Sequence, residues 1–575
     1  MSRYSLLFFL ALAQLMPAQS VDAFFKDTFE QMLRQDPQFA TSIGRHEYDD
    51  RWTDWSKAAR AQRRQFFEDR LKTAADFSTS GLSGQNRLTL RIVQYDFHSE
   101  LEAWDLTIHL LSVGQLFGFH NRVYVLVDRM PVRTVHDYQN IIARLRAIPT
   151  YVDQNIEILN EAIAIKMMQP RIVADLVTQQ LTAQLNQDAD HSHLLDGFRN
   201  FPSNIPQADQ QRLRAEATDA YNQQFLPAWH KLHDYMATTY SEHVRPADSL
   251  SSIPNGREDY AILVRRLTTT DMSPDQIHTL GEQEVKRIEG EMQAIAAETG
   301  FKGSLEEFQK KMAADSEQHF HSKDEMLVYC RNIAKIIEPN LPNQFHHLPM
   351  LLYGVRPIPA DREAATATNA QAPSPDFTTP GWFNLNTYQP EKQVKYDKES
   401  LVLHEAVPGH IFQITLAEAQ QTLPDIRKFY FNSAYVEGWA LYSESLGAQL
   451  GLYHDPYSRF GELASERFRA VRLVVDTGIH QLGWTREQAL EFFHQHAPEE
   501  APAEIDRYIS WPAQALSYKM GQLRIRSLRT AAEKRLGPKF DVRAYNDAVI
   551  RDGTLPLDLL SEQIDGFVSE AAAQQ

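Results

Sequence analysis

Four residues between positions 404 and 437 have the types and order that a hydrolytic metal site requires. Glu405 directly follows His404, a second histidine stands at His410, and Glu437 lies in an apolar stretch further on. A hydrolytic zinc site needs three protein ligands, an open position for water, and a base that takes the proton of that water. We therefore expect His404, His410 and Glu437 to bind Zn²⁺. Glu405 is then the expected catalytic base.

The spacing of the two histidines is unusual and predicts a break in the helix between them. In the common His-Glu-x-x-His motif the histidines lie one turn apart, but here Pro408 occupies the fourth position after His404. On a regular helix His410 would point about 240° away from His404. Pro408 has no N–H to donate and its ring clashes with the preceding turn, and Gly409 tolerates almost any backbone conformation. We expect a kink or bulge at 408–409 that turns His410 back towards His404.

Glu437 lies in an apolar segment, residues 435–444, which predicts a buried helix. An unpaired buried carboxylate is costly, so this glutamate either binds a metal or pairs with a core arginine. The histidine pair favours metal binding by Glu437, because a hydrolytic zinc site needs three protein ligands and the histidines supply only two. Glu444 stands two turns further on. It could orient a ligand histidine, or it could lie on an exposed helix face.

A hydrolase of this kind also needs a donor for the developing oxyanion, typically a tyrosine or histidine opposite the metal. The candidates are Tyr518, His480 and Tyr508. Taken alone, each residue is more often structural than catalytic. Tyr518 is preferred because it lies on a polar segment with Lys519 and Gly521, where apolar packing explains a tyrosine less well. His480 is the second choice.

Three further charged residues have two readings each. Arg507 and Arg524 could hold a substrate carboxylate through paired hydrogen bonds, although solvent exposure is the commoner situation of an arginine. Asp476 could support a metal ligand. Alternatively, it could pair with one of three arginines, Arg467, Arg469 and Arg472.

Helix signals dominate the elements that must position these residues. Capping patterns begin at Ser273, Ser304 and Thr485, and apolar residues recur at helical spacing between such caps. Alternating β-branched runs are nearly absent. We therefore expect an all-α fold with one small sheet. Residues 241–257 predict a connection between an N-terminal half (24–245) and a C-terminal catalytic half (246–575). Residues 354–380 predict a long loop, which residues 381–386 follow as a short strand.

The first 23 residues have the features of a secretory signal. Arg3 precedes an apolar run over residues 6–15, and small residues stand near cut sites after Ser20 or Ala23. The run is too short to span a bilayer, which needs about 20 apolar residues; a buried first helix is the alternative. The only cysteine, Cys330, is too far away for lipid attachment here. We expect an exported protein, periplasmic or secreted, without stable membrane association.

The net charge and the cysteine count exclude several classes of function. The 575-residue chain carries a formal charge of −17, so it has no basic field with which to bind nucleic acid or an anionic membrane. A single cysteine excludes an internal disulfide, a thiolate metal cluster and a redox pair of cysteines. A soluble enzyme or a binding protein is compatible with both observations.

The motif His-Glu-Ala-Val-Pro-Gly-His, with Glu-Gly-Trp-Ala-Leu-Tyr downstream, resembles the DUF885 family. Three further segments of the C-terminal half, 255–292, 475–480 and 514–521, are also similar to the family, although Asn255 stands where the family has an aspartate. DUF885 is a group of mostly uncharacterised proteins placed among the gluzincin-type metallopeptidases. The resemblance implies a fold related to angiotensin-converting enzyme and the thimet oligopeptidases. Those have two helical halves around a deep channel, with a short strand near the zinc that binds extended peptide.

The expected function is therefore zinc-dependent hydrolysis of oligopeptides or dipeptides by metal-activated water. Residues 381–386 are well placed in the chain to be the strand that pairs with the peptide through its edge. Two alternatives remain. The same site could hydrolyse another amide, such as a cell-wall peptide, or the fold could serve a non-catalytic peptide-binding protein. A binding protein would have no use for the base.

Overall fold

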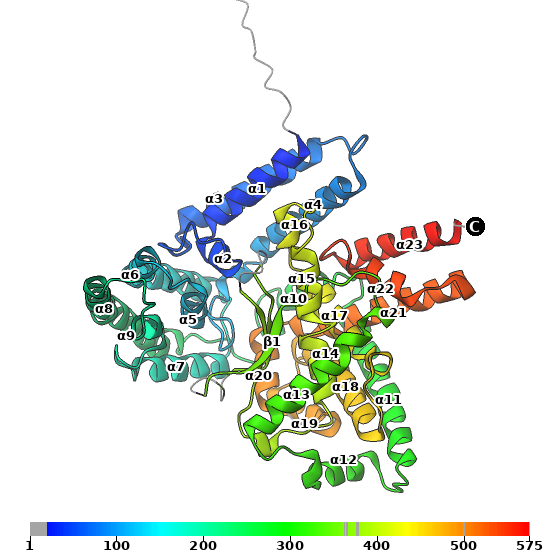
Figure 1. The fold of residues 1–575 in the computed structure, drawn as a ribbon. Coiled ribbons are helices and arrows are strands. Elements are labelled where there is room, and N and C mark those ends of the chain that lie inside the picture. Colours follow the sequence, from blue (N-terminus) through cyan, green and yellow to red (C-terminus); the bar gives the residue numbers. More distant parts are fainter. Residues whose placement is uncertain (1–19, 361–362, 364–365, 375–378, 498–500, 574–575) are drawn as a thin grey trace, which may run out of the picture.

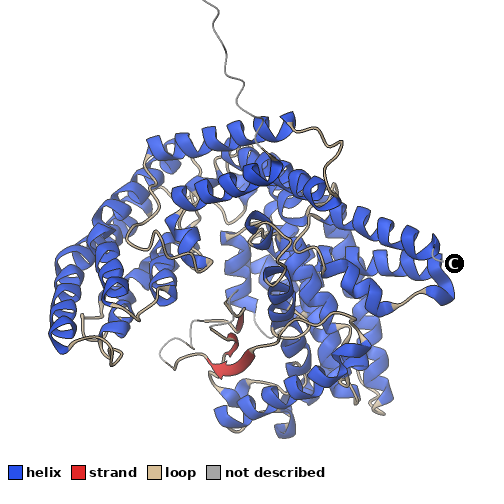
Figure 2. Ribbon diagram, turned by 45° about the horizontal axis from the view of Figure 1, so that its top comes forward, coloured by secondary structure: helices blue, strands red, loops and turns tan. Residues whose placement is uncertain are grey.

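A computed structural model describes residues 20–573, apart from 361–362, 364–365, 375–378 and 498–500. The structure is almost entirely helical, with a single small sheet among the described residues, as Figure 2 shows. This confirms the expected all-α fold. Residues 1–19, most of the expected signal segment, lie outside the described residues. Within the described ranges, no helix has the length and apolar character needed to cross a membrane.

The N-terminal half consists of helices and the segments that connect them. Ser20 caps the first helix by accepting a hydrogen bond from the Ala23 N–H, and Thr134 and Asp137 form a capping box at the start of the longest helix. The α-helices are α1 (Val21–Gln35), α2 (Pro37–Ser42), α3 (Lys57–Asp76), α4 (Gly84–Asp105), α5 (Phe119–Arg129), α6 (Val135–Ile165), α7 (Arg171–Leu185), α8 (Gln207–Ala220) and α9 (Leu226–Tyr235).

The C-terminal half contains the expected metal-site residues on helices of its own. The capping boxes predicted at Ser273, Ser304 and Thr485 are all present and start three of these helices. The α-helices are α10 (Gly256–Thr268), α11 (Pro274–Glu298), α12 (Leu305–Ala314), α13 (Lys323–Ile337), α14 (Lys398–Glu405), α15 (His410–Glu418), α16 (Asp425–Lys428), α17 (Ser433–Glu444), α18 (Pro456–His480), α19 (Arg486–His496), α20 (Ala501–Ser510), α21 (Ser517–Leu536), α22 (Val542–Ile550) and α23 (Leu557–Ala573).

The sheet has the strands β1 (Tyr353–Pro357), β2 (Asn369–Gln371) and β3 (Gly381–Leu385). The strand predicted at 381–386 is therefore confirmed, and its residues alternate between buried and partly exposed positions. The strand order is β1-β3-β2, with β1 parallel and β2 antiparallel to β3. The expectation that β3 pairs with a peptide through its edge is wrong. Segment 354–380, expected to be a loop, supplies a neighbour on each side and makes β3 the central strand.

One buried core connects the two halves. It includes Trp229 and Met236 from the N-terminal half and Val471 and Val475 of α18 from the C-terminal half. Helices α5–α9 lie together at one end of the molecule in Figure 1, and the sheet lies on the side of the C-terminal helices that faces them. Because apolar side chains of both halves pack in this core, each half buries part of its apolar surface against the other.

Candidate metal centre

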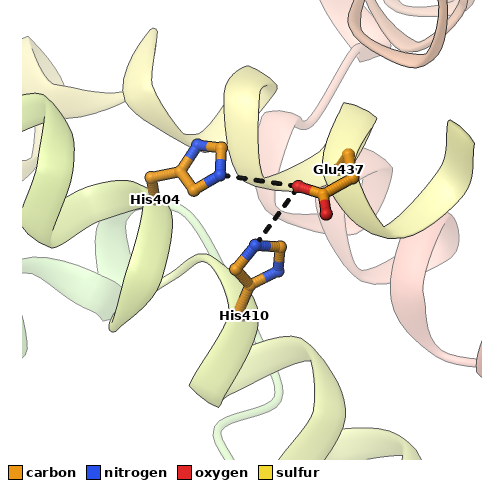
Figure 3. Close-up of side chains that lie close together, drawn as sticks. All are labelled: His404, His410 and Glu437. Atoms are coloured by element: carbon orange, nitrogen blue, oxygen red, sulfur yellow. Dashed lines mark ion pairs between the residues drawn. The ribbon is translucent and has the colours of Figure 1, made fainter. Parts of the chain in front are cut away.

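The structure brings together the three residues expected to bind a metal. His404 Nε2 lies 3.7 Å from Glu437 Oε2, and His410 Nε2 lies 3.4 Å from the same oxygen. Figure 3 shows both side chains directed at this carboxylate. One ligand atom of each residue lies within 4.8 Å of the other two. Tetrahedral bonds of about 2.0–2.1 Å to zinc would place neighbouring ligand atoms about 3.4 Å apart. The side chains are therefore arranged nearly as a zinc ion requires.

The predicted break in the helix lies between the two histidines. Helix α14 ends at Glu405 and α15 begins at His410. A Cβ atom on Gly409 would lie 1.9 Å from the carbonyl oxygen of His404, so only glycine fits this close approach. The indole Nε1 of Trp439 donates a 2.8 Å hydrogen bond to the carbonyl of Pro408 and ties the break to α17. The backbone geometry at 408–409 thus directs both imidazoles towards Glu437.

Glu444 orients His404 from the far side of the imidazole. Its Oε1 lies 2.7 Å from His404 Nδ1, and the side chain is buried rather than on an exposed helix face. An ionised carboxylate only accepts hydrogen bonds, so Nδ1 carries the proton. Although burial lowers the pKa of His404, its hydrogen bonds to the carboxylates of Glu437 and Glu444 raise it to about 9. Burial by itself would raise the pKa of Glu437, but the imidazoles of His404 and His410 lower it well below its usual range.

Glu405, the expected base, lies at the C-terminal end of α14 and is partly exposed. Burial raises the pKa of its carboxyl group, and the neighbouring imidazoles of His410 and His404 oppose this rise. In the part of the chain that the structure describes, no hydrogen bond or ion pair engages the Glu405 carboxylate. Its oxygens are therefore available to accept a proton.

Tyr518 lies beside the metal centre. Its ring is nearly parallel to that of His404, with a centroid separation of 6.2 Å and an interplanar angle of 17°. The guanidinium of Arg507 donates a 3.1 Å hydrogen bond to the tyrosine hydroxyl, and that of Arg472 lies 4.5 Å from the ring centroid. Because the hydroxyl accepts from Arg507, its own proton is free to be donated to another group.

The other two candidates for the oxyanion donor are occupied elsewhere. His480 is fully buried; its Nδ1 accepts from the Leu250 N–H at 3.0 Å and its Nε2 donates to the Tyr508 carbonyl at 2.9 Å. Burial lowers the pKa of His480 to about 3, so the ring is neutral and both nitrogens are used. The Tyr508 hydroxyl donates to Glu504 at 2.6 Å. The structure thus gives both residues packing and hydrogen-bonding roles within the core.

The remaining charged candidates have partners within the protein. Asp476 accepts hydrogen bonds from the Tyr260 hydroxyl at 2.5 Å and the Ala513 N–H at 3.0 Å. These partners differ from the two that the sequence suggested, a metal ligand and one of three arginines. Arg507 donates a hydrogen bond to the Tyr518 hydroxyl and so helps to position this residue beside the candidate metal centre. Arg524 pairs with Asp558 at 3.3 Å near the surface.

A glycine contact that the sequence analysis missed holds Glu437 and Tyr518 close to each other. Helix α17 carries Glu437, α21 carries Tyr518, and the two helices pack through Gly438 and Gly521. A Cβ atom on Gly521 would lie 1.8 Å from the carbonyl oxygen of Ala434 and 2.7 Å from Gly438 Cα. The helix backbones therefore touch directly. Glycines at these positions were visible in the sequence, but their pairing across 83 residues was not.

The fold and the site agree with the family assignment. The family model described as "Bacterial protein of unknown function (DUF885)" matches residues 37–564, so the chain belongs to this family, including most of its N-terminal half. No curated protein matches the chain.

Solved structures of other proteins share the fold. A "putative lipoprotein" from Colwellia psychrerythraea is 25% identical, with a TM-score of 0.91 over 96% of this chain and 99% of the other. A "putative lipoprotein of unknown function" from Shewanella oneidensis is 18% identical, with a TM-score of 0.74 over 94% of this chain and 99% of the other. The arrangement of the helices is thus common to these proteins.

Proposed function

We propose that this protein is an exported, zinc-dependent peptidase. The observation that carries the proposal is the convergence of His404, His410 and Glu437 on one point, with the free carboxylate of Glu405 beside them. Two histidines and a glutamate are a known ligand set of hydrolytic zinc sites, which keep a fourth position open.

The charges at the site support a bound cation. With the proton of His404 on Nδ1, its Nε2 presents a lone pair to the Glu437 carboxylate at 3.7 Å. Two acceptors that face each other repel unless a positive charge lies between them. In the protein alone a second proton on His404 supplies that charge. A zinc ion would replace this proton, and its chemistry is to polarise the scissile carbonyl and to make a water more acidic.

The residues around the expected zinc ligands would transfer the proton, stabilise the oxyanion and orient a ligand. Glu405 would take the proton from the attacking water and later return it to the leaving amine. The Tyr518 hydroxyl, whose oxygen accepts from Arg507, would donate its proton as a hydrogen bond to the developing oxyanion. Glu444 fixes the tautomer and the orientation of His404.

We propose a peptide as the substrate because backbone groups of a sheet lie near the candidate metal centre. Strands β2 and β3 contact α15, the helix that begins at His410. An extended peptide can form main-chain hydrogen bonds with such a sheet. Because β3 is central, the strand edges that remain are those of β1 and β2. A cell-wall peptide or another amide would use the same metal and base, and assays with such compounds test that alternative.

Export rests on the signal features of the first 23 residues and on likeness to proteins described as putative lipoproteins. Unlike a lipid-modified cysteine near the N-terminus, Cys330 is buried in α13. We therefore propose export without attachment through this cysteine.

Metal analysis and two substitutions test the proposed function. The purified protein is expected to hold one zinc ion per chain and to cleave members of a mixed peptide library, as read by mass spectrometry. A chelator should abolish cleavage and added zinc should restore it. Glu405→Gln should retain zinc and lose about 10²–10⁴-fold in kcat, because the base is removed and the ligands are not. His410→Ala should lose the metal.

The controls separate these effects from misfolding. Glu533→Gln changes a partly exposed glutamate on α21 and should leave zinc content and cleavage unchanged. Full metal content in His410→Ala would show that the ligand assignment is wrong. A protein without stoichiometric zinc, or one that binds zinc and cleaves no amide, would contradict the peptidase proposal.

A further inference from the structure

A cavity of about 500 Å³ lies where the N-terminal half meets the helix that carries Glu437. Its walls come from α4, the loop before α5, α10, the start of α17 and the loop after α20. Ser433 is part of this wall and lies one turn before Glu437 on the same face of α17. Four residues of helix span only about 6 Å. The cavity wall at Ser433 therefore lies about 6 Å along α17 from Glu437, a distance that about two residues of an extended peptide would span.

The same wall is connected to the residues beside the metal site. The Gln514 amide donates to the Ser433 hydroxyl at 3.5 Å, and its oxygen accepts from Arg507 at 2.5 Å. Arg507 in turn donates to Tyr518. A molecule in this cavity would thus lie against the hydrogen-bonded residues that position the expected oxyanion donor.

Apolar side chains are exposed in the cavity instead of being buried. Phe117 is 59% exposed and Phe431 is 64% exposed, and both line it. Phe117 also packs against Trp511, with ring centroids 4.5 Å apart. Large apolar groups that gather in a concave surface, with few polar groups among them, are typical of a ligand site.

One carboxylate among the described residues of the cavity wall has no bonded partner. Asp96 and Glu100 lie one turn apart on α4 and both line the cavity, as does Arg266 of α10. Arg266 forms an ion pair with Glu100. Within the described ranges, Asp96 has neither a hydrogen bond nor an ion pair. Burial, with a contribution from Glu100, raises the pKa of Asp96 to about 7, and the charge of Arg266, which is paired with Glu100, offsets this rise only in part.

We propose that this cavity is a substrate subsite that binds a cationic group of the peptide at Asp96 and an apolar neighbour between Phe117 and Phe431. The cationic group is either the free amino terminus or a lysine or arginine side chain. Both are nitrogen cations that donate charge-assisted hydrogen bonds to a carboxylate, and aromatic faces in the cavity favour them further. This inference rests on the proposed peptidase function, since it assigns the substrate class of that site.

The test compares peptides that differ in one charge. A peptide with a free amino terminus is paired with its N-acetylated form, and a lysine peptide with its norleucine analogue. For the zinc-loaded full-length protein, kcat/KM should favour at least one cationic peptide over its neutral partner by about tenfold, the effect of one charge-assisted hydrogen bond. The pair that shows the preference identifies the source of the cation. Asp96→Asn should reduce the preference to less than about twofold.

A carboxylate elsewhere on the same helix provides the control. The Asp105 side chain is 65% exposed at the end of α4 and lies outside the cavity, so Asp105→Asn should keep the full preference. Equal cleavage of both members of each pair by the wild-type protein would overturn the inference and leave the peptidase proposal standing. An unchanged preference in Asp96→Asn would overturn it as well.

Calorimetric binding to the Glu405→Gln protein separates the two proposals. The same peptide pairs should bind with the same charge preference, because Glu405 does not line the cavity. Preferential binding of the cationic peptides without any cleavage by the wild type would refute the peptidase and support the subsite. Equal affinity for the cationic and the neutral peptide of each pair would refute the subsite, whether or not peptides are cleaved.

Discussion

At the residue scale, one hydrogen bond decides which nitrogen of His404 faces the other ligands. Glu444 accepts from Nδ1 at 2.7 Å and leaves Nε2 directed at Glu437. Arg469 lies 3.9 Å from the same carboxylate oxygen and balances its buried charge in part. The three expected ligands follow from residue type and spacing, whereas the partner of His404 is 40 positions away and depends on how α14 packs against α17.

Replacing Glu444 should therefore weaken the metal site without removing a ligand. We expect Glu444→Ala to lower zinc affinity by about 10–100-fold, because His404 loses the acceptor that fixes its tautomer and orientation. Glu444→Gln keeps an acceptor oxygen and should have a smaller effect. Competition with a chromogenic chelator measures the affinity, and Glu533→Gln is again the control. Unchanged affinity in Glu444→Ala would contradict the orienting role.

At the element scale, the site depends on two places where backbones approach closely. Gly409 permits the break between α14 and α15, and Gly438 and Gly521 permit the contact between α17 and α21. The first of these was predictable, since Pro408 and Gly409 lie within seven residues of His404 and act locally. The second was not, because nothing in the sequence near either glycine indicates which helix it will meet.

The α17–α21 contact can be tested by adding one methyl group. Gly521→Ala should force the two helices apart and cost about 1–3 kcal/mol of unfolding free energy. It should also reduce kcat, because Tyr518 moves away from His404, while the three zinc ligands remain. Denaturant unfolding, zinc content and peptide cleavage are measured together. Loss of zinc with unchanged stability would contradict this account.

A second glycine provides the matched control for this substitution. Gly566 lies in α23, and a Cβ atom there would meet no heavy atom within 4 Å. Gly566→Ala should leave cleavage unchanged and stabilise the protein by up to about 1 kcal/mol, since alanine is the better helix former. The contrast between the two variants assigns the effect to the close contact and not to the loss of a glycine.

At the scale of the whole molecule, the two halves share their largest core, and the cavity that we assign to substrate lies where they meet. The boundary expected near residue 245 falls in an irregular segment, between Tyr240 and Leu250. The sequence could indicate that connection by its composition. It could not indicate that apolar side chains from both sides of the connection pack together.

A fragment test follows from the shared core. Residues 246–575 contain every expected metal ligand, yet expressed alone they should not fold cooperatively, because the fragment exposes the part of the shared core that packs against the N-terminal half, where α20 meets α7. Circular dichroism during heating should show no sharp transition, and zinc binding should be weak. A cooperative transition with full-affinity zinc binding would show that the C-terminal half is an independent domain.

The sequence by itself determined the residue types of the candidate metal centre, the break between His404 and His410, the helical fold and the strand at 381–386. Each depends on residues close in the chain, where backbone geometry and side-chain chemistry act directly. Tertiary structure alone decided that Glu444 holds His404, that β3 is a central strand, and that Tyr518 rather than His480 lies beside the imidazoles. Those outcomes depend on which helices pack together and which strands pair, and such contacts between distant segments leave no local pattern in one sequence.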